Sequence, residues 1–221
     1  MQLLARYPVP SIAGTANNYT RVANDLDHQS QFDARVDGKF RANDLGFVRY
    51  SYFSDVDQPA TPFADGSGAI SGAVLGTNNV VGLSNVLGQQ AVANETHIFS
   101  GNMLTDLRAG YTRRSNNIVG STLSSSPSAA LGIPGIPTNA AFNNALPLFT
   151  LTGIQQLGPS SGTFSSYETA VTQLVDTFSR TAGAHTVKFG ADLRWYQLNA
   201  VAPGNPTGAF GFTTTGTDQQ A

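Results

Sequence analysis

The sequence contains no cysteine, and this absence removes several kinds of chemistry at once. It excludes a disulfide framework, a thiolate metal site and a cysteine nucleophile. Charged residues are also scarce, at 12% of the chain, which is about half of their usual share in a soluble globular domain. The net charge of -2 offers no basic surface for nucleic acid, so we expect no nucleic-acid partner.

Long hydrophobic runs are missing as well. No stretch approaches the roughly 18 apolar residues of a membrane-spanning helix. The N-terminal sequence MQLLARYPVPS has no apolar run of signal-peptide length, and prolines follow at once. The chain is therefore either cytoplasmic or a piece of a longer protein, and the strand pattern favours the second interpretation.

Catalytic motifs are absent too. The sequence has no G-x-S-x-G elbow, no P-loop and no dinucleotide fingerprint. The three histidines, His28, His97 and His185, are far apart in sequence and form no ligand pair. Asp55 and Asp57, with Asp65 nearby, could bind calcium through carboxylate oxygens, but no spaced loop motif supports such a site. We therefore expect no enzyme, and no catalytic, cofactor-binding or metal site.

The sequence does contain strands with two unlike faces. Residues 186–199, TVKFGADLRWYQLN, alternate between apolar and polar side chains, which is the period of a β-strand. The apolar set is Val187, Phe189, Ala191, Leu193 and Trp195, and the alternate set is Lys188, Gly190, Asp192, Arg194 and Tyr196.

This alternation recurs on both sides of short turns. QSQFDARVDGKF is followed by the turn RAND and the strand LGFVRYSYFSD, and MLTDLRAGYTRR follows the turn SGN. We predict antiparallel hairpins near residues 30–55, 91–113 and 168–199, although the alternation does not assign the faces of 91–100 and 168–180. The C-terminal GAFGFTTTGT predicts the start of a seventh strand.

Long loops separate the predicted hairpins. They cover about residues 56–90 and 115–165, are rich in Gly, Asn, Ser and Pro, and all lie at the same end of the predicted sheet. Short turns at one end and long loops at the other are typical of transmembrane β-barrels. Strands of about eleven residues would span roughly 36 Å, or roughly 25 Å along the membrane normal at a tilt of about 45°. The predicted fold is all-β: an antiparallel meander of hairpins, which is an incomplete segment of a transmembrane barrel.

In such a barrel one strand face meets lipid and the other a wet lumen. The lipid-facing candidates are Phe32, Val36, Leu107, Tyr111, Val187, Phe189, Leu193 and Trp195. The lumen-facing candidates are Asp33, Arg35, Asp37, Lys39, Asp106, Arg108, Lys188, Asp192 and Arg194. The lumen charges alternate in sign, which fits either a cross-strand ladder of ion pairs or contact with a plug or substrate. The apolar stretches LGIPGIP and LPLFTLTG could pack on a neighbouring loop or grip a ligand.

The chain resembles the Oar-like, carboxypeptidase-regulatory-type branch of TonB-dependent outer-membrane receptors. The motifs occur in the family's order and cover nearly the whole chain: LLARYPVP, ANNYTRVANDLDHQSQFDARVDGKF, FVRYSYF, LTDLRAGYTRR, LGIPGIP and HTVKFGADLRWYQLN. The resemblance implies a 22-stranded barrel with a plugged lumen, in the bacterial outer membrane. It also implies energy supplied through the TonB complex and transport of a ligand that the sequence does not identify.

The chain departs from this family because no signal peptide, plug domain or TonB box is found in it. We therefore expect residues 1–221 to be one partial barrel domain of about six strands plus the start of a seventh, in contact with outer-membrane lipid. Two alternatives remain open. One is a barrel that only anchors adhesive or structural surface loops, and the other is a soluble β-sandwich binding module.

Overall fold

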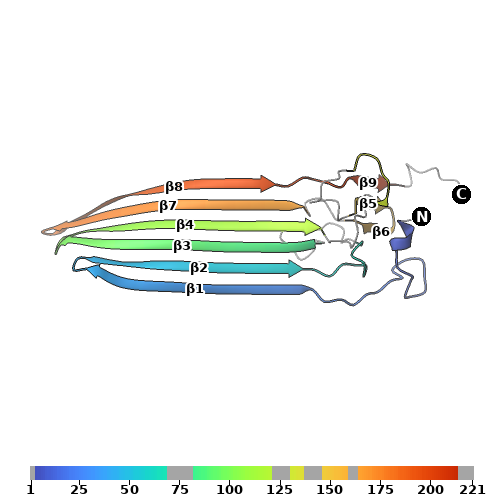
Figure 1. The fold of residues 1–221 in the computed structure, drawn as a ribbon, viewed down its shortest axis with the longest axis horizontal. Helices are drawn as coiled ribbons and strands as arrows, with labels where there is room; N and C mark the ends of the chain where they lie inside the picture. The colour runs from blue at the N-terminus through green and yellow to red at the C-terminus, as the bar shows by residue number, and fades with distance from the viewer. Residues whose placement is uncertain (1–2, 69–81, 121–129, 137–145, 159–163, 214–221) are drawn as a thin grey trace.

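Six long antiparallel strands form a single curved sheet in a computed structural model, which describes residues 3–68, 82–120, 130–136, 146–158 and 164–213 (Figure 1). The strands are β1 (Leu26–Arg41), β2 (Asp44–Gln58), β3 (Gly82–Ser100), β4 (Met103–Gly120), β7 (Ser165–Ala182) and β8 (His185–Val201). Each strand pairs with the next in the order β1-β2-β3-β4-β7-β8. The predicted all-β meander of hairpins is therefore confirmed, and the sheet is not closed.

The three hairpin turns all lie at one end of the sheet (Figure 1). Each turn consists of two residues, at 42–43, 101–102 and 183–184. In the last turn Gly183 has φ +59°, a left-handed conformation that glycine adopts without strain. These tight turns fix the register of each hairpin.

The long strands extend further than the sequence predicted. They contain 15 to 19 residues, against the predicted eleven or so. The predicted loop 56–90 shortens to 59–81 and the predicted loop 115–165 to 121–164. The loop ends were misassigned because apolar alternation fades there, whereas backbone pairing continues, as in the pair Val86↔Asp55. Alternation of apolar and polar residues appears only where the two faces of a strand have different environments. Backbone hydrogen bonds between strands form whether or not the side chains alternate.

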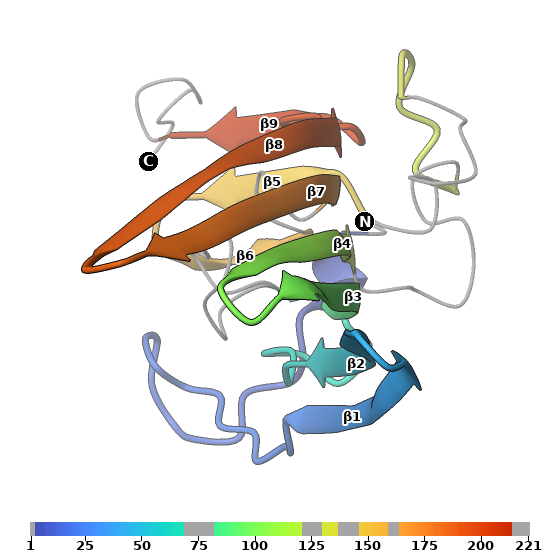
Figure 2. The ribbon, with the colours of Figure 1, turned by 90° about the vertical axis from the view of Figure 1, so that its left-hand side faces the viewer.

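A second, three-stranded sheet lies at the loop end (Figure 1), behind the long sheet in the end-on view of Figure 2. Part of the long loop before β7 forms two short strands, β5 (Leu148–Leu151) and β6 (Ile154–Leu157), which the sequence did not predict. The predicted start of a seventh barrel strand, β9 (Ala209–Phe212), pairs in parallel with β5 and not with β8. The rings of Phe149 and Phe210 stack across this pair, with centroids 5.2 Å apart.

The well-packed core of the described residues lies in this region, which we call the cap: residues 3–25, 59–68, 130–136, 146–158 and 202–213. Phe63, Phe149 and Leu157 are its buried centre. Partly buried apolar side chains from the N-terminal segment, the loops and β9 surround it: Leu3, Tyr7, Tyr19, Leu131, Ile133, Leu151 and Phe210. The stretches LGIPGIP and LPLFTLTG therefore pack on neighbouring loop segments, which is one of the two roles predicted for them.

The N-terminal segment contributes to the cap through a short 3-10 helix, η1 (Leu4–Arg6). The first and last described elements, η1 and β9, both lie at the cap end of the molecule (Figure 1). None of the helices in the described part of the chain has the length and apolar character needed to cross a bilayer.

Candidate functional site: two faces of the long sheet

Strand register decides which side chains share a face, because directly paired residues of antiparallel strands point to the same side. All eight lipid-facing candidates lie on one face, which we call the apolar face, and all nine lumen-facing candidates lie on the other, the polar face. The register also assigns the two strands whose faces the sequence left open. Ala91 and Ala93 of β3, and Thr172 and Leu174 of β7, lie on the apolar face.

One row of paired residues crosses the apolar face from edge to edge. Its six members are all aliphatic: Val36, Val48, Ala93, Ala109, Leu174 and Leu193. The next row toward the cap contains Tyr50, Tyr111 and Trp195. Leu193 and Trp195 are 51% and 55% exposed, so the described chain leaves a broad apolar surface uncovered. Exposed patches of this extent mark contact with a membrane or a partner.

Aromatic rings flank this aliphatic row on both sides. On the cap side the rings of Phe32 and Tyr52 stack with centroids 5.6 Å apart. On the turn side the rings of Phe178 and Phe189 lie 4.9 Å apart, and Phe99 follows at 6.2 Å from Phe178. Two aromatic bands around an aliphatic zone are the pattern of outer-membrane barrels, where the rings sit at the lipid–water interfaces.

The spacing of the two bands can be compared with a membrane. Phe40 and Phe32 are eight positions apart on β1, which is roughly 26 Å along the strand at about 3.3 Å per residue. A strand tilt of about 40° reduces this to roughly 20 Å, close to the apolar band of about 25 Å in known barrels. The remaining length of each strand projects beyond this zone toward the cap.

Polar pairs mark the borders of the apolar face. On the cap side Arg113 Nη2 lies 3.2 Å from Glu168 Oε1. On the turn side Asp44 contacts the His97 ring and Thr105 Oγ1 donates to Asp176 Oδ1 at 2.7 Å. Leu107 pairs directly with Glu95 and Asp176, so it lies at the border of the aliphatic zone and not at its centre.

The polar face differs in detail from the predicted cross-strand ladder of ion pairs. Its ion pairs join residues two apart on one strand: Arg35 to Asp37 at 2.6 Å, Arg194 to Asp192 at 2.6 Å and Arg108 to Asp106 at 3.8 Å. Such pairs form within a strand because residues i and i+2 lie on the same face. Within the described residues Lys39 and Lys188 form no ion pair.

Neutral side chains make many of the cross-strand links instead. Arg49 Nη2 donates to Gln90 Oε1 at 2.7 Å, and Gln90 Nε2 donates to Thr112 Oγ1 at 3.1 Å. Gln173 Nε2 donates to both carboxylate oxygens of Asp192, at 2.9 and 3.1 Å. These hydrogen bonds satisfy polar side chains that remain accessible to water. Such a surface suits the wall of a hydrated lumen.

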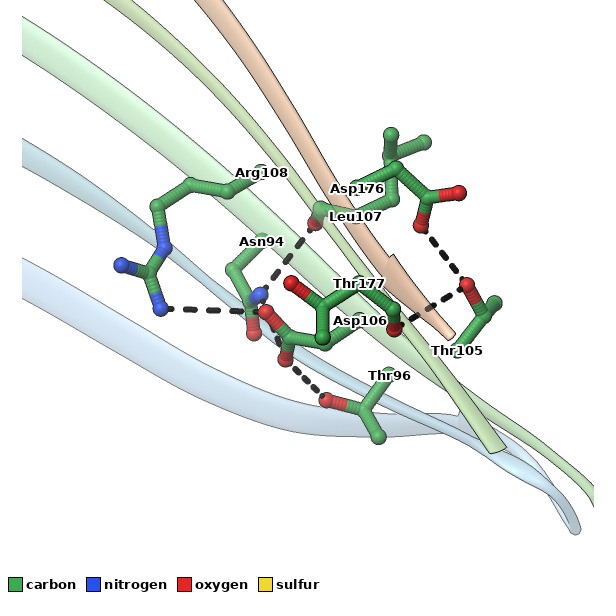
Figure 3. A network of polar contacts seen from close by, with 8 residues as sticks. All are labelled: Asn94, Thr96, Thr105, Asp106, Leu107, Arg108, Asp176 and Thr177. Carbon is green, nitrogen blue, oxygen red and sulfur yellow. Dashed lines mark hydrogen bonds and ion pairs between the residues drawn. The ribbon is translucent and has the colours of Figure 1, made fainter. Parts of the chain in front are cut away.

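Asp106 is the centre of one such network, at the turn side of the polar face (Figure 3). Its Oδ2 accepts hydrogen bonds from Asn94 Nδ2 at 3.0 Å and from Thr96 Oγ1 at 2.8 Å. Asn94 Nδ2 also donates to the carbonyl oxygen of Leu107 at 3.2 Å. These hydrogen bonds link the side chains of β3 to β4. The sequence singled out Asp106 and Arg108, but Asn94 and Thr96 were missed because neutral residues carry no charge pattern.

Of the other polar candidates, Asp55 and Asp57 share one face of β2, but no group of side chains among the described residues is arranged to hold a metal ion. His97 contacts Asp44, whereas His28 lies beside Ser30, with 3.5 Å between His28 Nε2 and the hydroxyl. Asp65 pairs with Arg6 in the cap, at 3.2 Å, and accepts hydrogen bonds from Ser67.

A family model described as an outer membrane beta barrel domain matches residues 1–221. A search of curated proteins and a search of solved structures find no match to the chain.

Proposed function

Because the chain belongs to the outer membrane beta barrel domain family, we propose that its long sheet is part of the wall of a TonB-dependent receptor that transports a ligand. Membership of this family means that the protein is an outer-membrane barrel protein, located in the bacterial outer membrane and in contact with its lipid. Transport, energy from TonB and the Oar-like character are the proposed part.

The contrast between the two sheet faces is the observation that supports a transport wall most strongly. One face carries an aliphatic row between aromatic bands, and the other carries charged and amide side chains linked to one another. A charged face needs water. It therefore suits a barrel wide enough to hold a hydrated lumen.

The open edges of the sheet favour a wide barrel as well. β1 and β8 each have one long edge with no paired strand among the described residues. In lipid, an unpaired backbone N–H or C=O costs several kcal/mol. We infer that both edges pair with further strands in the complete barrel.

A barrel that only anchors surface loops is the second candidate, and the folded cap is compatible with it. The cap has its own buried core, formed by Phe63, Phe149 and Leu157. A folded unit at the end of a barrel suits adhesion as well as ligand capture.

Association with TonB distinguishes the two candidates. The full-length protein, purified in detergent, would be mixed with the periplasmic domain of TonB, and complex formation measured by co-elution. A transporter forms the complex and an anchor does not. A barrel protein without a TonB box serves as the control for non-specific binding.

A further inference from the structure

A cavity of about 660 Å³ lies in the cap. Three segments line it: residues 7–23 before β1, residues 60–63 after β2, and the turn between β5 and β6 at 153–155. Tyr7 Oη donates to the carbonyl oxygen of Gln155 at 2.7 Å, which ties the first segment to the third. The volume falls within the roughly 300–1,000 Å³ of small-molecule sites.

Aromatic side chains form one part of the cavity wall. Tyr7 and Tyr19 both pack edge-to-face on Phe63, with ring centroids 5.5 and 5.9 Å apart. Burial raises the pKa of the Tyr7 hydroxyl, so this group remains a hydrogen-bond donor at neutral pH. Aromatic rings of this kind offer a flat apolar surface beside polar groups.

A loop held in one shape by its own hydrogen bonds forms the polar part of the wall. The carbonyl oxygen of Asn18 accepts from the backbone N–H groups of Ser11 and Ile12, at 2.8 and 3.0 Å. Next to it Asn17 has φ +51°, the one left-handed residue other than glycine in the described part of the chain. Such conformations concentrate at ligand-binding positions. The amide of Asn17 can donate and accept hydrogen bonds at once.

Arg21 is the one charged side chain among the described residues that line the cavity. Its guanidinium donates to the carbonyl oxygen of Thr61, which positions the group. The described lining residues include no carboxylate, and Arg21 forms no ion pair among the described residues. A guanidinium that is oriented in this way, without a counter-ion, recognises a carboxylate or another planar anion.

We propose that this cavity binds an acidic saccharide of the uronate type. Its carboxylate pairs with Arg21, its hydroxyl groups hydrogen-bond to the Asn17 amide, and a sugar-ring face packs on the aromatic wall at Tyr19. Adjacent sugar hydroxyls require groups that donate and accept together, which amides do. This inference rests on the proposed function, because it names the ligand class that a receptor with this cap would capture.

Binding of tetragalacturonate to the full-length protein, purified in detergent and measured by calorimetry, tests the proposal. Arg21→Gln should weaken binding at least tenfold. Arg6→Gln is the matched control, since Arg6 lies in the cap but outside the cavity lining, and it should change the Kd less than twofold. Asn17→Gly keeps the left-handed backbone while it removes the amide, and should weaken binding several-fold. Heat-modifiable gel mobility checks that each variant is folded.

Neutral maltotetraose provides the test of charge and should bind at least tenfold more weakly than tetragalacturonate. No binding of tetragalacturonate, equal binding of the neutral sugar, or an unchanged Kd in Arg21→Gln would overturn the proposal. The binding assay needs neither TonB nor an energised membrane. Binding of tetragalacturonate without TonB association would therefore contradict the proposed transport function and support the proposed ligand class. TonB association without binding of tetragalacturonate would support transport and contradict the ligand class.

Discussion

Neighbouring residues of the long strands meet opposite surroundings although a single peptide bond joins them. Leu174 belongs to the aliphatic row that crosses the apolar face, whereas Gln173 donates two hydrogen bonds to Asp192 on the polar face. Both residues lie at the same depth on the same strand. They therefore form a matched pair for testing what each face contacts.

The first prediction compares Leu174→Arg with Gln173→Arg. In a lipid bilayer Leu174→Arg should lower the free energy of unfolding by about 2–4 kcal/mol, the cost of a cation on the lipid face near the midplane. Gln173→Arg places the same charge next to Asp192 and water, so its loss should stay below about 1 kcal/mol. The measurement is reversible unfolding of the full-length protein in vesicles of one lipid composition. Equal losses at the two positions would favour a soluble sandwich.

A second residue-scale prediction concerns a close backbone approach. A Cβ atom added at Gly190 would lie 2.3 Å from the carbonyl oxygen of Asp176 on β7. Gly190→Ala should therefore destabilise the β7–β8 hairpin by about 1–3 kcal/mol, as overpacking does. The strand glycine Gly110 is the control, because the nearest atom to its added Cβ would be 3.9 Å away. Denaturant unfolding of the two variants in the same detergent provides the comparison, and an equal effect of both would contradict the close approach.

At the scale of elements, the cap combines segments that are far apart in sequence. β5 pairs with β9 in parallel, and Phe149 in β5 is only 2% exposed. The cap core therefore depends on one strand from the loop before β7 and one from the segment after β8. Loss of that core should loosen the cap and leave the long hairpins paired.

The variant Phe149→Ala tests this independence. Removal of a buried aromatic side chain costs about 3–5 kcal/mol, so the backbone amides of the cap should lose protection from hydrogen exchange while those of the long strands stay protected. Phe212→Ala in β9 is the control, because Phe212 is 46% exposed and its loss should change little. The measurement is hydrogen exchange with mass spectrometry. Equal loss of protection in β4 and β7 would show that cap and sheet unfold as one unit.

The sequence predicted the hairpins well because one face of each strand is apolar over several residues. The alternation in β8 alone correctly separates Leu193 from Asp192. It failed where apolar and polar residues mix on both faces, as at Val86 and Leu87 of β3, so the strand ends beyond the aromatic bands were assigned to loops. It also failed for β9, because the four-residue sequence AFGF does not reveal whether its partner is β8 or β5.

The polar face shows a similar limit. The alternation correctly grouped the charged residues on one face of the sheet, but it did not predict their partners. Arg35 is held by Asp37 on its own strand and lies over the Phe47 ring, 3.8 Å from its centroid. Hydrogen bonds between amide and hydroxyl side chains, such as Gln90 with Thr112, depend on the register between two strands. Alternation along one strand does not determine which residue of the neighbouring strand lies opposite.

At the scale of the whole molecule, the fold separates three environments. The cap provides a buried protein core, the apolar face is suited to a hydrocarbon phase, and the polar face is suited to water. A soluble sandwich would cover the apolar face with a second sheet. Among the described residues, no second sheet packs against the aliphatic row: its members Val36 and Leu193 are exposed.

The central claim is that the apolar face contacts lipid and the polar face contacts water. Its most direct test is a scan of single spin labels along residues 188–196 of β8, in the full-length protein in a lipid bilayer. Collisions with lipid-soluble oxygen should peak at Phe189, Leu193 and Trp195, and collisions with a water-soluble nickel reagent at Lys188, Asp192 and Arg194, with a period of two. A nickel maximum at Leu193 and Trp195, or no alternation between the two reagents, would contradict the claim.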